Sequence, residues 1–150
     1  MASLTPQSTL ASFFLQDHRD CDADWIAVEK ALNQGDAEAG RQAWAAFEKA
    51  MIRHFNMEEE VLFPAFETAT GMTQGPTAVM RMEHEQMKGL MKQIGAALEA
   101  NDFDEALDQG DTLLMVIQQH NVKEEGVLYP MSENTLGAQW DELRSKLEQY

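Results

Sequence analysis

"HFNMEEEVLFP" occupies residues 54–64, and "HNVKEEGVLYP" occupies residues 120–130. Both stretches fit one pattern: a histidine, three residues, two glutamates, one residue, Val-Leu, an aromatic residue and a proline. An offset of 66 residues separates the two copies, and the same offset relates His18 to His84. All four histidines of the chain therefore belong to mirrored pairs. The sequence predicts two copies of one structural unit.

The first copy has the pattern of a helical hairpin. Apolar residues recur at helical spacing from about residue 10 to "NQGD". A second helical segment begins at Asp36, which is a good N-cap, and has Pro64 near its end. The stretch "TATGMTQGP" that follows is the most loop-like part of the chain.

The second copy repeats this organisation. Its first helix begins at Pro76 and ends at "EAND"; its second begins after the N-cap Asp102 and stops before Pro130. No segment shows the alternation of a strand. We therefore expect an all-α, up-down-up-down four-helix bundle with a short fifth helix. The expected boundaries are one domain over residues 1–150, hairpins at about 10–66 and 76–130, and a C-terminal helix at about 136–149.

Composition narrows the classes of function. The net charge of −15 would repel nucleic acid and anionic membranes. The single cysteine excludes an intramolecular disulfide and fits a reducing compartment. The N-terminal stretch "MASLTPQSTLASFF" lacks the basic region and the long apolar run of a signal peptide or membrane span. We expect a cytoplasmic protein, either a monomer or a weak dimer.

The mirrored residues combine imidazole and carboxylate groups on core-facing stripes. His54 and Glu58 lie one helical turn apart, as do His120 and Glu124, and apolar residues flank both pairs. Polar side chains on such stripes are costly unless they are paired or coordinated. Each histidine alone would be an ordinary core histidine, but the joint arrangement favours a metal site. The candidate ligands are His18, His54, Glu58, His84, His120 and Glu124.

The order of these residues resembles the hemerythrin-like (HHE cation-binding) family. The pattern H, HxxxE, H, HxxxE covers His18 to Pro130, and "DHRDCD", "EHEQM" and "WDELRSKLEQY" are also similar to family blocks. The resemblance implies a bundle that holds two iron ions, bridged by carboxylates and by an oxo or hydroxo oxygen. Glu58 and Glu124 would be the bridging carboxylates. Pairing by hairpin puts His18 with His54 and His84 with His120, although pairing across hairpins stays possible.

The sequence departs from the oxygen-carrying members of that family in the third helix. Those proteins have two histidines four residues apart there, whereas Met80 and Lys88 flank His84 here. Each iron would then have about five ligands where six are preferred. This departure favours peroxide or nitric oxide chemistry, or oxidation to a stable diferric form, over reversible oxygen storage.

Several neighbours of the candidate ligands have two interpretations each. Asp17 and Glu83 are either hydrogen-bond acceptors for a ligand imidazole or solvated acids. Glu59 and Glu125 are expected to face a groove or solvent, with an extra ligand or a proton relay as the alternative. The sequence favours packing roles for two further residues, Cys21 and Tyr129.

The function that we expect is binding of O2 or NO, or reaction with them or with peroxide, at a di-iron site. One alternative is a di-iron enzyme that reduces peroxide or nitric oxide. Another is a bundle that buffers zinc or mixed cations. A role in iron–sulfur repair ranks lower, because members with that role carry an additional N-terminal domain with a cysteine, and this chain begins almost directly with the bundle.

Overall fold

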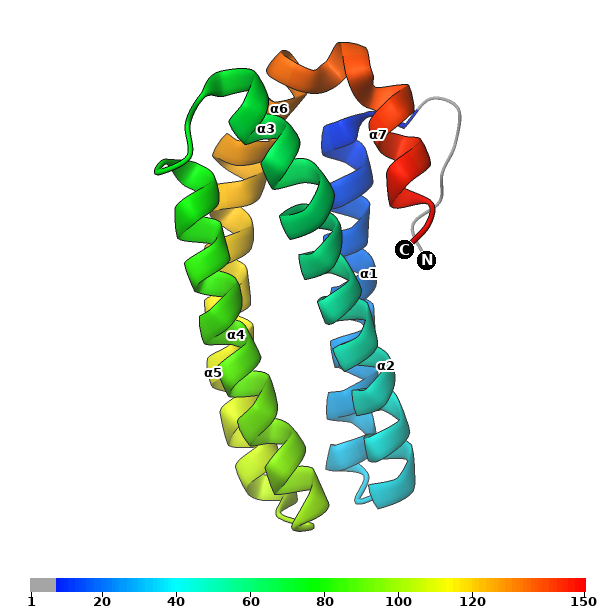
Figure 1. Ribbon diagram of the computed structural model, residues 1–150. Coiled ribbons are helices and arrows are strands. Elements are labelled where there is room, and N and C mark those ends of the chain that lie inside the picture. The colour runs from blue at the N-terminus through cyan, green and yellow to red at the C-terminus, as the bar shows by residue number, and fades with distance from the viewer. Residues whose placement is uncertain (1–7) are drawn as a thin grey trace.

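A computed structural model describes residues 8–150, which contain four long helices and no strand. The predicted absence of a signal peptide falls partly on residues 1–7, outside the described residues. In Figure 1 the chain descends in the first long helix, returns in the second, descends in the third and returns in the fourth. The four are α1 (Leu10–Asn33), α2 (Ala37–Met57), α4 (Pro76–Glu99) and α5 (Phe103–Lys123).

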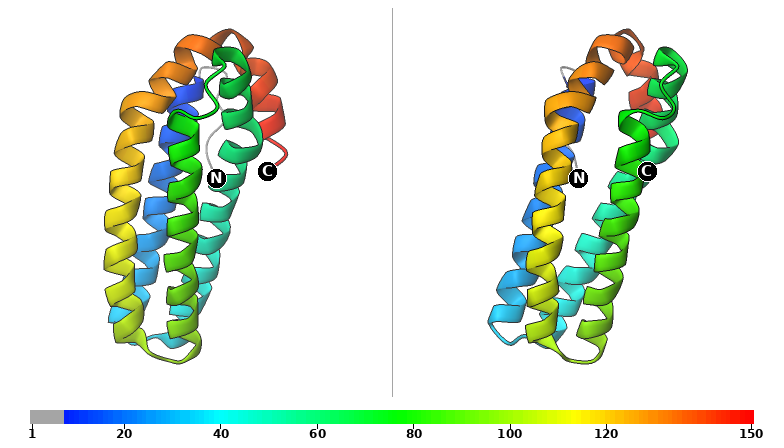
Figure 2. Two further views of the ribbon diagram at one scale, coloured as in Figure 1. Left: turned by 60° about the vertical axis from the view of Figure 1, so that its left-hand side comes forward. Right: turned by 90° about the vertical axis from the view of Figure 1, so that its left-hand side faces the viewer.

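The two tight turns between paired helices are built alike. Asp36 caps α2 by accepting a hydrogen bond from the backbone N–H of Ala39 at 3.1 Å. Asp102 caps α5 by accepting from the N–H of Glu105 at 3.2 Å. The residue before each cap has a positive φ, 71° at Gly35 and 57° at its repeat counterpart Asn101. Both turns lie at the lower end of the bundle in Figures 1 and 2.

The helical path was expected to end near Pro64 in the first hairpin and before Pro130 in the second, but it continues beyond both prolines. After α2 the chain passes through a π-helical turn, η1 (Glu58–Leu62), into α3 (Phe63–Thr70); after α5 it passes through η2 (Glu124–Leu128) into α6 (Tyr129–Leu136). Each proline is the second residue of the short helix. Because a proline has no N–H and its ring crowds the preceding turn, the wider π turn lets the helical path continue.

Two apolar clusters fill the bundle and leave a polar layer between them. The upper cluster includes Phe14, Leu62, Phe66 and Leu128, and the lower cluster includes Trp25 with residues of the other three long helices. The chain ends in η3 (Gly137–Gln139) and α7 (Trp140–Leu147), whose side chains Trp140, Leu143 and Leu147 join the upper cluster. No helix within residues 8–150 is both long and apolar enough to cross a membrane.

Candidate metal centre

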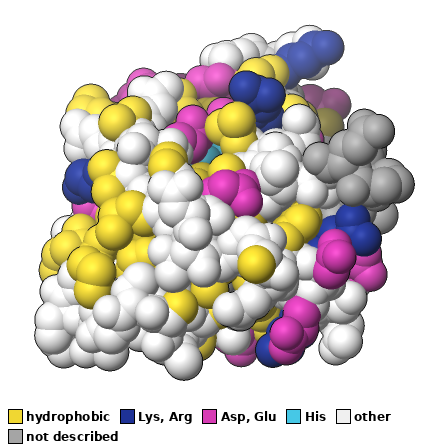
Figure 3. Space-filling model, turned by 90° about the horizontal axis from the view of Figure 1, so that it is seen from above, with side chains coloured by type: hydrophobic (Ala, Val, Ile, Leu, Met, Phe, Trp, Pro, Cys, Tyr) yellow, Lys and Arg dark blue, Asp and Glu magenta, His cyan; other side chains and the backbone are white. Residues whose placement is uncertain are grey.

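The polar layer between the apolar clusters contains all six candidate ligands. α1, α2, α4 and α5 each contribute one histidine, and the π turns η1 and η2 contribute Glu58 and Glu124. The exposed fraction of each is 4% or less. Figure 3 looks down on the end formed by α3, α6 and α7, and only a small area of histidine is visible between hydrophobic and acidic side chains.

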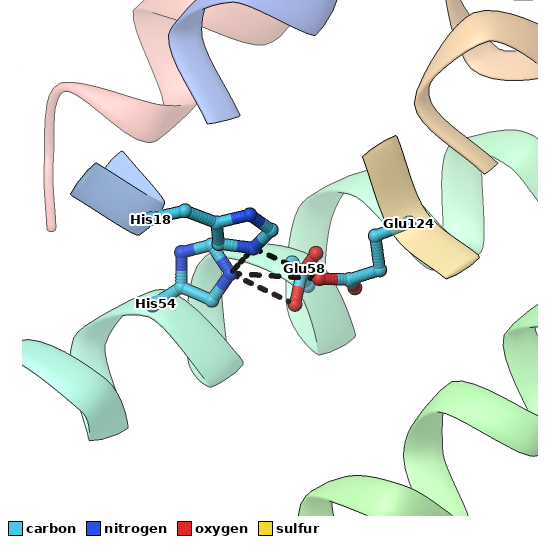
Figure 4. Close-up of side chains that lie close together, drawn as sticks. All are labelled: His18, His54, Glu58 and Glu124. Atoms are coloured by element: carbon cyan, nitrogen blue, oxygen red, sulfur yellow. Dashed lines mark hydrogen bonds and ion pairs between the residues drawn. The ribbon is translucent and has the colours of Figure 1, made fainter. Parts of the chain in front are cut away.

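One half of the layer is made by the first hairpin and both glutamates. The Nε2 atoms of His18 and His54 are 3.1 Å apart, and both rings point toward the two carboxylates, as Figure 4 shows. His18 Nε2 lies 3.0 Å from Glu124 Oε1, and His54 Nε2 lies 3.2 Å from Glu58 Oε1. These four side chains come from four different helical segments and form one potential cation site.

The other half of the layer uses the same two carboxylates. His84 Nε2 lies 3.1 Å from Glu58 Oε1, and His120 Nε2 lies 3.2 Å from Glu124 Oε1. In each half the four potential ligand atoms lie within 4.8 Å of one another. The layer therefore offers two adjacent cation positions that share both glutamates, and its histidines group by hairpin.

The donor atoms of this layer fit a bound cation better than they fit one another. Glu58 Oε1, His84 Nε2, His120 Nε2 and Glu124 Oε2 are buried, and none has a hydrogen-bond partner within residues 8–150. Close approaches such as His84 to Glu58 at 3.1 Å therefore lack hydrogen-bond geometry. Because buried polar atoms are nearly always paired, these orphaned atoms need a common partner, which a metal ion would supply.

Every imidazole is oriented by a carboxylate on its far side. The Nδ1–H of each ring donates to that carboxylate, which directs the Nε2 lone pair into the layer. Two of these hydrogen bonds stay within a hairpin, and two cross between hairpins. The pairs are His54–Asp17 (2.7 Å), His120–Glu83 (2.8 Å), His84–Glu59 (2.6 Å) and His18–Glu125 (2.7 Å).

These pairs test the expectations for the neighbouring acids. Of the two interpretations of Asp17 and Glu83, the structure shows the hydrogen bonds to imidazoles. The expectation that Glu59 and Glu125 face a groove or solvent was incomplete, because their side chains are 23% and 38% exposed while their carboxylates accept from imidazoles of the other hairpin. A π turn winds more loosely than an α-helix, so the residue after each central glutamate is turned less far from the layer.

Without a cation, the negative charges in the layer favour protonation of its histidines. Burial alone would lower the pKa of His54, but the charge of Glu58 and the hydrogen bond to Asp17 raise it well above its ordinary value. Burial opposes protonation of His84 and His120 too, yet the carboxylates beside them raise the pKa of both: Glu58 and Glu59 for His84, and Glu124 and Glu83 for His120. A metal ion must displace these protons, so its affinity falls as the pH is lowered.

The hydroxyl of Tyr129 also reaches the layer, a contact that the sequence did not predict. This hydroxyl lies 2.7 Å from Glu58 Oε2 and 3.0 Å from both Glu124 Oε1 and His18 Nε2. The assignment of Tyr129 to packing alone was therefore wrong, although its ring does stack on Phe14 at 5.3 Å. The only signal was one letter, the tyrosine in "VLYP" where the other copy has phenylalanine.

A cavity of about 10 Å³ lies against the layer on its lower side. His18, His54 and His120 line it, together with apolar side chains such as Phe47 and Met51. That volume holds about one water-sized molecule. Cys21 also lines the cavity but belongs to neither cation group of the described residues. Burial raises the pKa of the Cys21 thiol to about 12, which fits the predicted role as a core residue.

Within residues 8–150 the protein is a helical bundle whose buried cluster of histidines and carboxylates has the composition of a cation site. Residues 9–132 match the Hemerythrin HHE cation binding domain. The chain belongs to this family, in agreement with the resemblance of its motifs. Comparison with curated proteins and comparison with solved structures each gave no match.

Proposed function

We propose that the protein is a non-haem di-iron protein that binds or reacts with O2, NO or peroxide in the core of an up-down-up-down bundle. The proposal rests on the two groups of four ligands that share both Glu58 and Glu124. Two imidazoles on either side of two shared carboxylates suit a pair of adjacent cations. The proposed ligands are His18, His54, Glu58, His84, His120 and Glu124.

The donor set favours iron over zinc. Structural zinc sites are usually closed and tetrahedral, with four side chains around one ion. Shared carboxylates between two imidazole pairs are instead typical of carboxylate-bridged di-iron and di-manganese centres in bundles. Iron would supply the redox and diatomic-ligand chemistry of the site. The single cysteine of the chain fits a reducing, cytoplasmic setting.

The chain's own residues hold and shield the centre. Four carboxylates fix the imidazole rings through their Nδ1 atoms, so that the Nε2 atoms stay aimed at the cations. The apolar clusters above and below keep bulk water out of the layer. The small cavity beside His18, His54 and His120 accepts a molecule of the size of water or a diatomic gas.

The same geometry supports a second candidate function, in which the protein is an enzyme that reduces peroxide or nitric oxide. The oxygen carriers have a second histidine four residues from the first in their third helix, but here the residues four away from His84 are Met80 and Lys88. Each position therefore has only two imidazoles. A position without a full ligand set can take an exogenous molecule. Sustained turnover with added reductant supports the enzyme, whereas one spectral change per centre supports the binding protein.

The first experiment is metal analysis of protein purified without added metal, together with its visible spectrum. We expect two iron ions per chain and a spectrum that changes on reduction and on return to air. A spectral change that reverses on removal of O2 or NO favours binding, and irreversible oxidation favours the enzyme. Zinc in place of iron, or no metal at all, would refute the di-iron proposal.

A further inference from the structure

The two cation positions are related by the repeat, but the aromatic residues beside them differ. Tyr129 follows η2, and its counterpart Phe63 follows η1 at the same offset of 66 residues. Both side chains are buried, at 1% and 0% exposure. The ring of Phe63 packs against His84 at a centroid distance of 5.7 Å and offers only carbon atoms. Tyr129 brings an oxygen atom to the other position.

The hydroxyl of Tyr129 stands among the donors of the His18–His54 position. Two donors that bind one ion at about 2.1 Å and at right angles to each other are roughly 3 Å apart. The spacing of His18 Nε2 to His54 Nε2, 3.1 Å, and to Glu124 Oε1, 3.0 Å, fits this geometry. The hydroxyl of Tyr129 has the same spacing, 3.0 Å from His18 Nε2, 3.0 Å from Glu124 Oε1 and 2.7 Å from Glu58 Oε2.

We propose that Tyr129 is a further metal ligand, which binds iron(III) through its phenol oxygen at the His18–His54 position. The inference rests on the proposed di-iron function and deepens it. On binding, an oxygen–iron bond replaces the O–H bond, and the proton passes to water. Phenolate oxygen is an established protein ligand for iron.

A phenolate at one position makes the centre asymmetric. The His18–His54 position then has five protein donors: two imidazoles, two carboxylates and the phenolate. The His84–His120 position keeps four, because Phe63 cannot bind a metal. An exogenous small molecule in the cavity is therefore expected to bind on the side of His120, which lines the cavity and belongs to the position with the less complete ligand set.

The chain allows a clean spectroscopic test, because it has only two tyrosines, Tyr129 and Tyr150. Tyr150 is 41% exposed and its hydroxyl donates to Glu60. In the iron(III) protein we expect a phenolate-to-iron charge-transfer band in the visible range, with phenolate ring modes in the resonance Raman spectrum. Tyr129→Phe should abolish both signals and keep most of the iron, and Tyr150→Phe should change neither.

Each outcome separates this inference from the proposed function. Two irons per chain without a phenolate band in the wild-type protein would overturn the ligand role of Tyr129 and leave the di-iron function intact. A band that survives in Tyr129→Phe, or disappears in Tyr150→Phe, would also overturn it. Absence of iron from the wild-type protein would refute the proposed function itself. The wild-type and Tyr150→Phe spectra decide the question even if Tyr129→Phe does not fold.

Discussion

The first hairpin, α1 with α2, and the second, α4 with α5, repeat the metal-binding pattern but differ in their apolar packing. Trp44 of the first hairpin corresponds to Gly110 of the second, and Trp25 corresponds to Met91. Trp25 packs directly over Gly110, where an added Cβ would overlap its ring. The large residues of one hairpin thus fill the space that a small residue of the other leaves open. A repeated site does not require repeated packing.

The basic side chains that contact the supporting acids also differ between the hairpins. Asp17 accepts from Arg53 Nη1 at 3.2 Å, whereas Glu83 accepts from Lys123. The repeat offset relates neither cation to the other. What the two halves share here is an acid that holds one imidazole and itself accepts from a basic side chain, Arg53 in one hairpin and Lys123 in the other. The copies are identical at their histidines and central glutamates, whereas the basic residues behind the supporting acids differ.

The largest expected effect concerns the residues that both halves share. Glu58 belongs to both cation groups, so Glu58→Ala should lower the iron content from two atoms per chain toward none. His54→Ala removes a ligand from one group and should leave about one atom. Metal analysis of the purified variants measures this. Glu60→Ala is the control, since Glu60 belongs to neither group, and full iron retention in both ligand variants would refute the assignment.

The next effect tests whether the hairpins are equivalent in their supporting acids. Asp17→Asn and Glu83→Gln each replace the carboxylate that orients one imidazole with an uncharged amide. We expect each to reduce metal affinity by about 10- to 100-fold, as measured by competition with a chelator. Glu85→Gln, an exposed neighbour of His84, should change nothing. A large loss in only one of the two variants would show that the halves are functionally unequal.

A smaller effect tests the complementary packing. Gly110→Ala forces a Cβ against Trp25 and should lower the free energy of unfolding by about 1–3 kcal/mol. Gly89→Ala in the other helix of the same hairpin meets no atom within 4 Å. It should raise the free energy of unfolding by about 0.5–1 kcal/mol, since alanine is the better helix former. Denaturant unfolding measures both, and a neutral Gly110→Ala would contradict the packing argument.

The smallest effect is the pH dependence of the metal-free protein. The raised pKa values of His54, His84 and His120 contribute stability that is complete below their ordinary value of 6.5 and is lost as the pH rises through the raised values. The Tm of the metal-free protein should therefore fall as the pH rises above neutrality.

The lowered pKa values of the supporting acids act at the other end of the pH range. Burial alone would raise the pKa of Asp17, but its hydrogen bond to His54 lowers it, and hydrogen bonds to imidazole lower the pKa of Glu59 as well. Their contribution to stability is present above the ordinary pKa values of 3.8 and 4.5 and is lost as the pH falls through the lowered values.

Metal-loaded protein should keep its Tm at high pH, because the cation replaces the imidazole protons. Thermal unfolding with and without metal tests this, and a metal-free Tm that rises above neutrality would contradict it.

The sequence alone determined the helical class, the two turns and the six candidate ligands that lie in the buried layer. Each of these follows from local information: the spacing of apolar residues, the caps Asp36 and Asp102, and a repeat in which His54 and Glu58 reappear as His120 and Glu124. A helix turns every 3.6 residues, so residues four apart share a face whatever surrounds them. The inward direction of those faces follows from their apolar neighbours.

Only the tertiary structure decided which side chains meet across the bundle. Glu59 and Glu125 reach imidazoles of the opposite hairpin, and the hydroxyl of Tyr129 meets side chains from three other helical segments. The π turns that carry the helices past Pro64 and Pro130 allow these contacts. Beyond the mirrored glutamates and the tyrosine in place of a phenylalanine, these contacts have no sequence signature. A hydrogen bond between distant residues depends on how the helices pack, and the helical period describes each helix by itself.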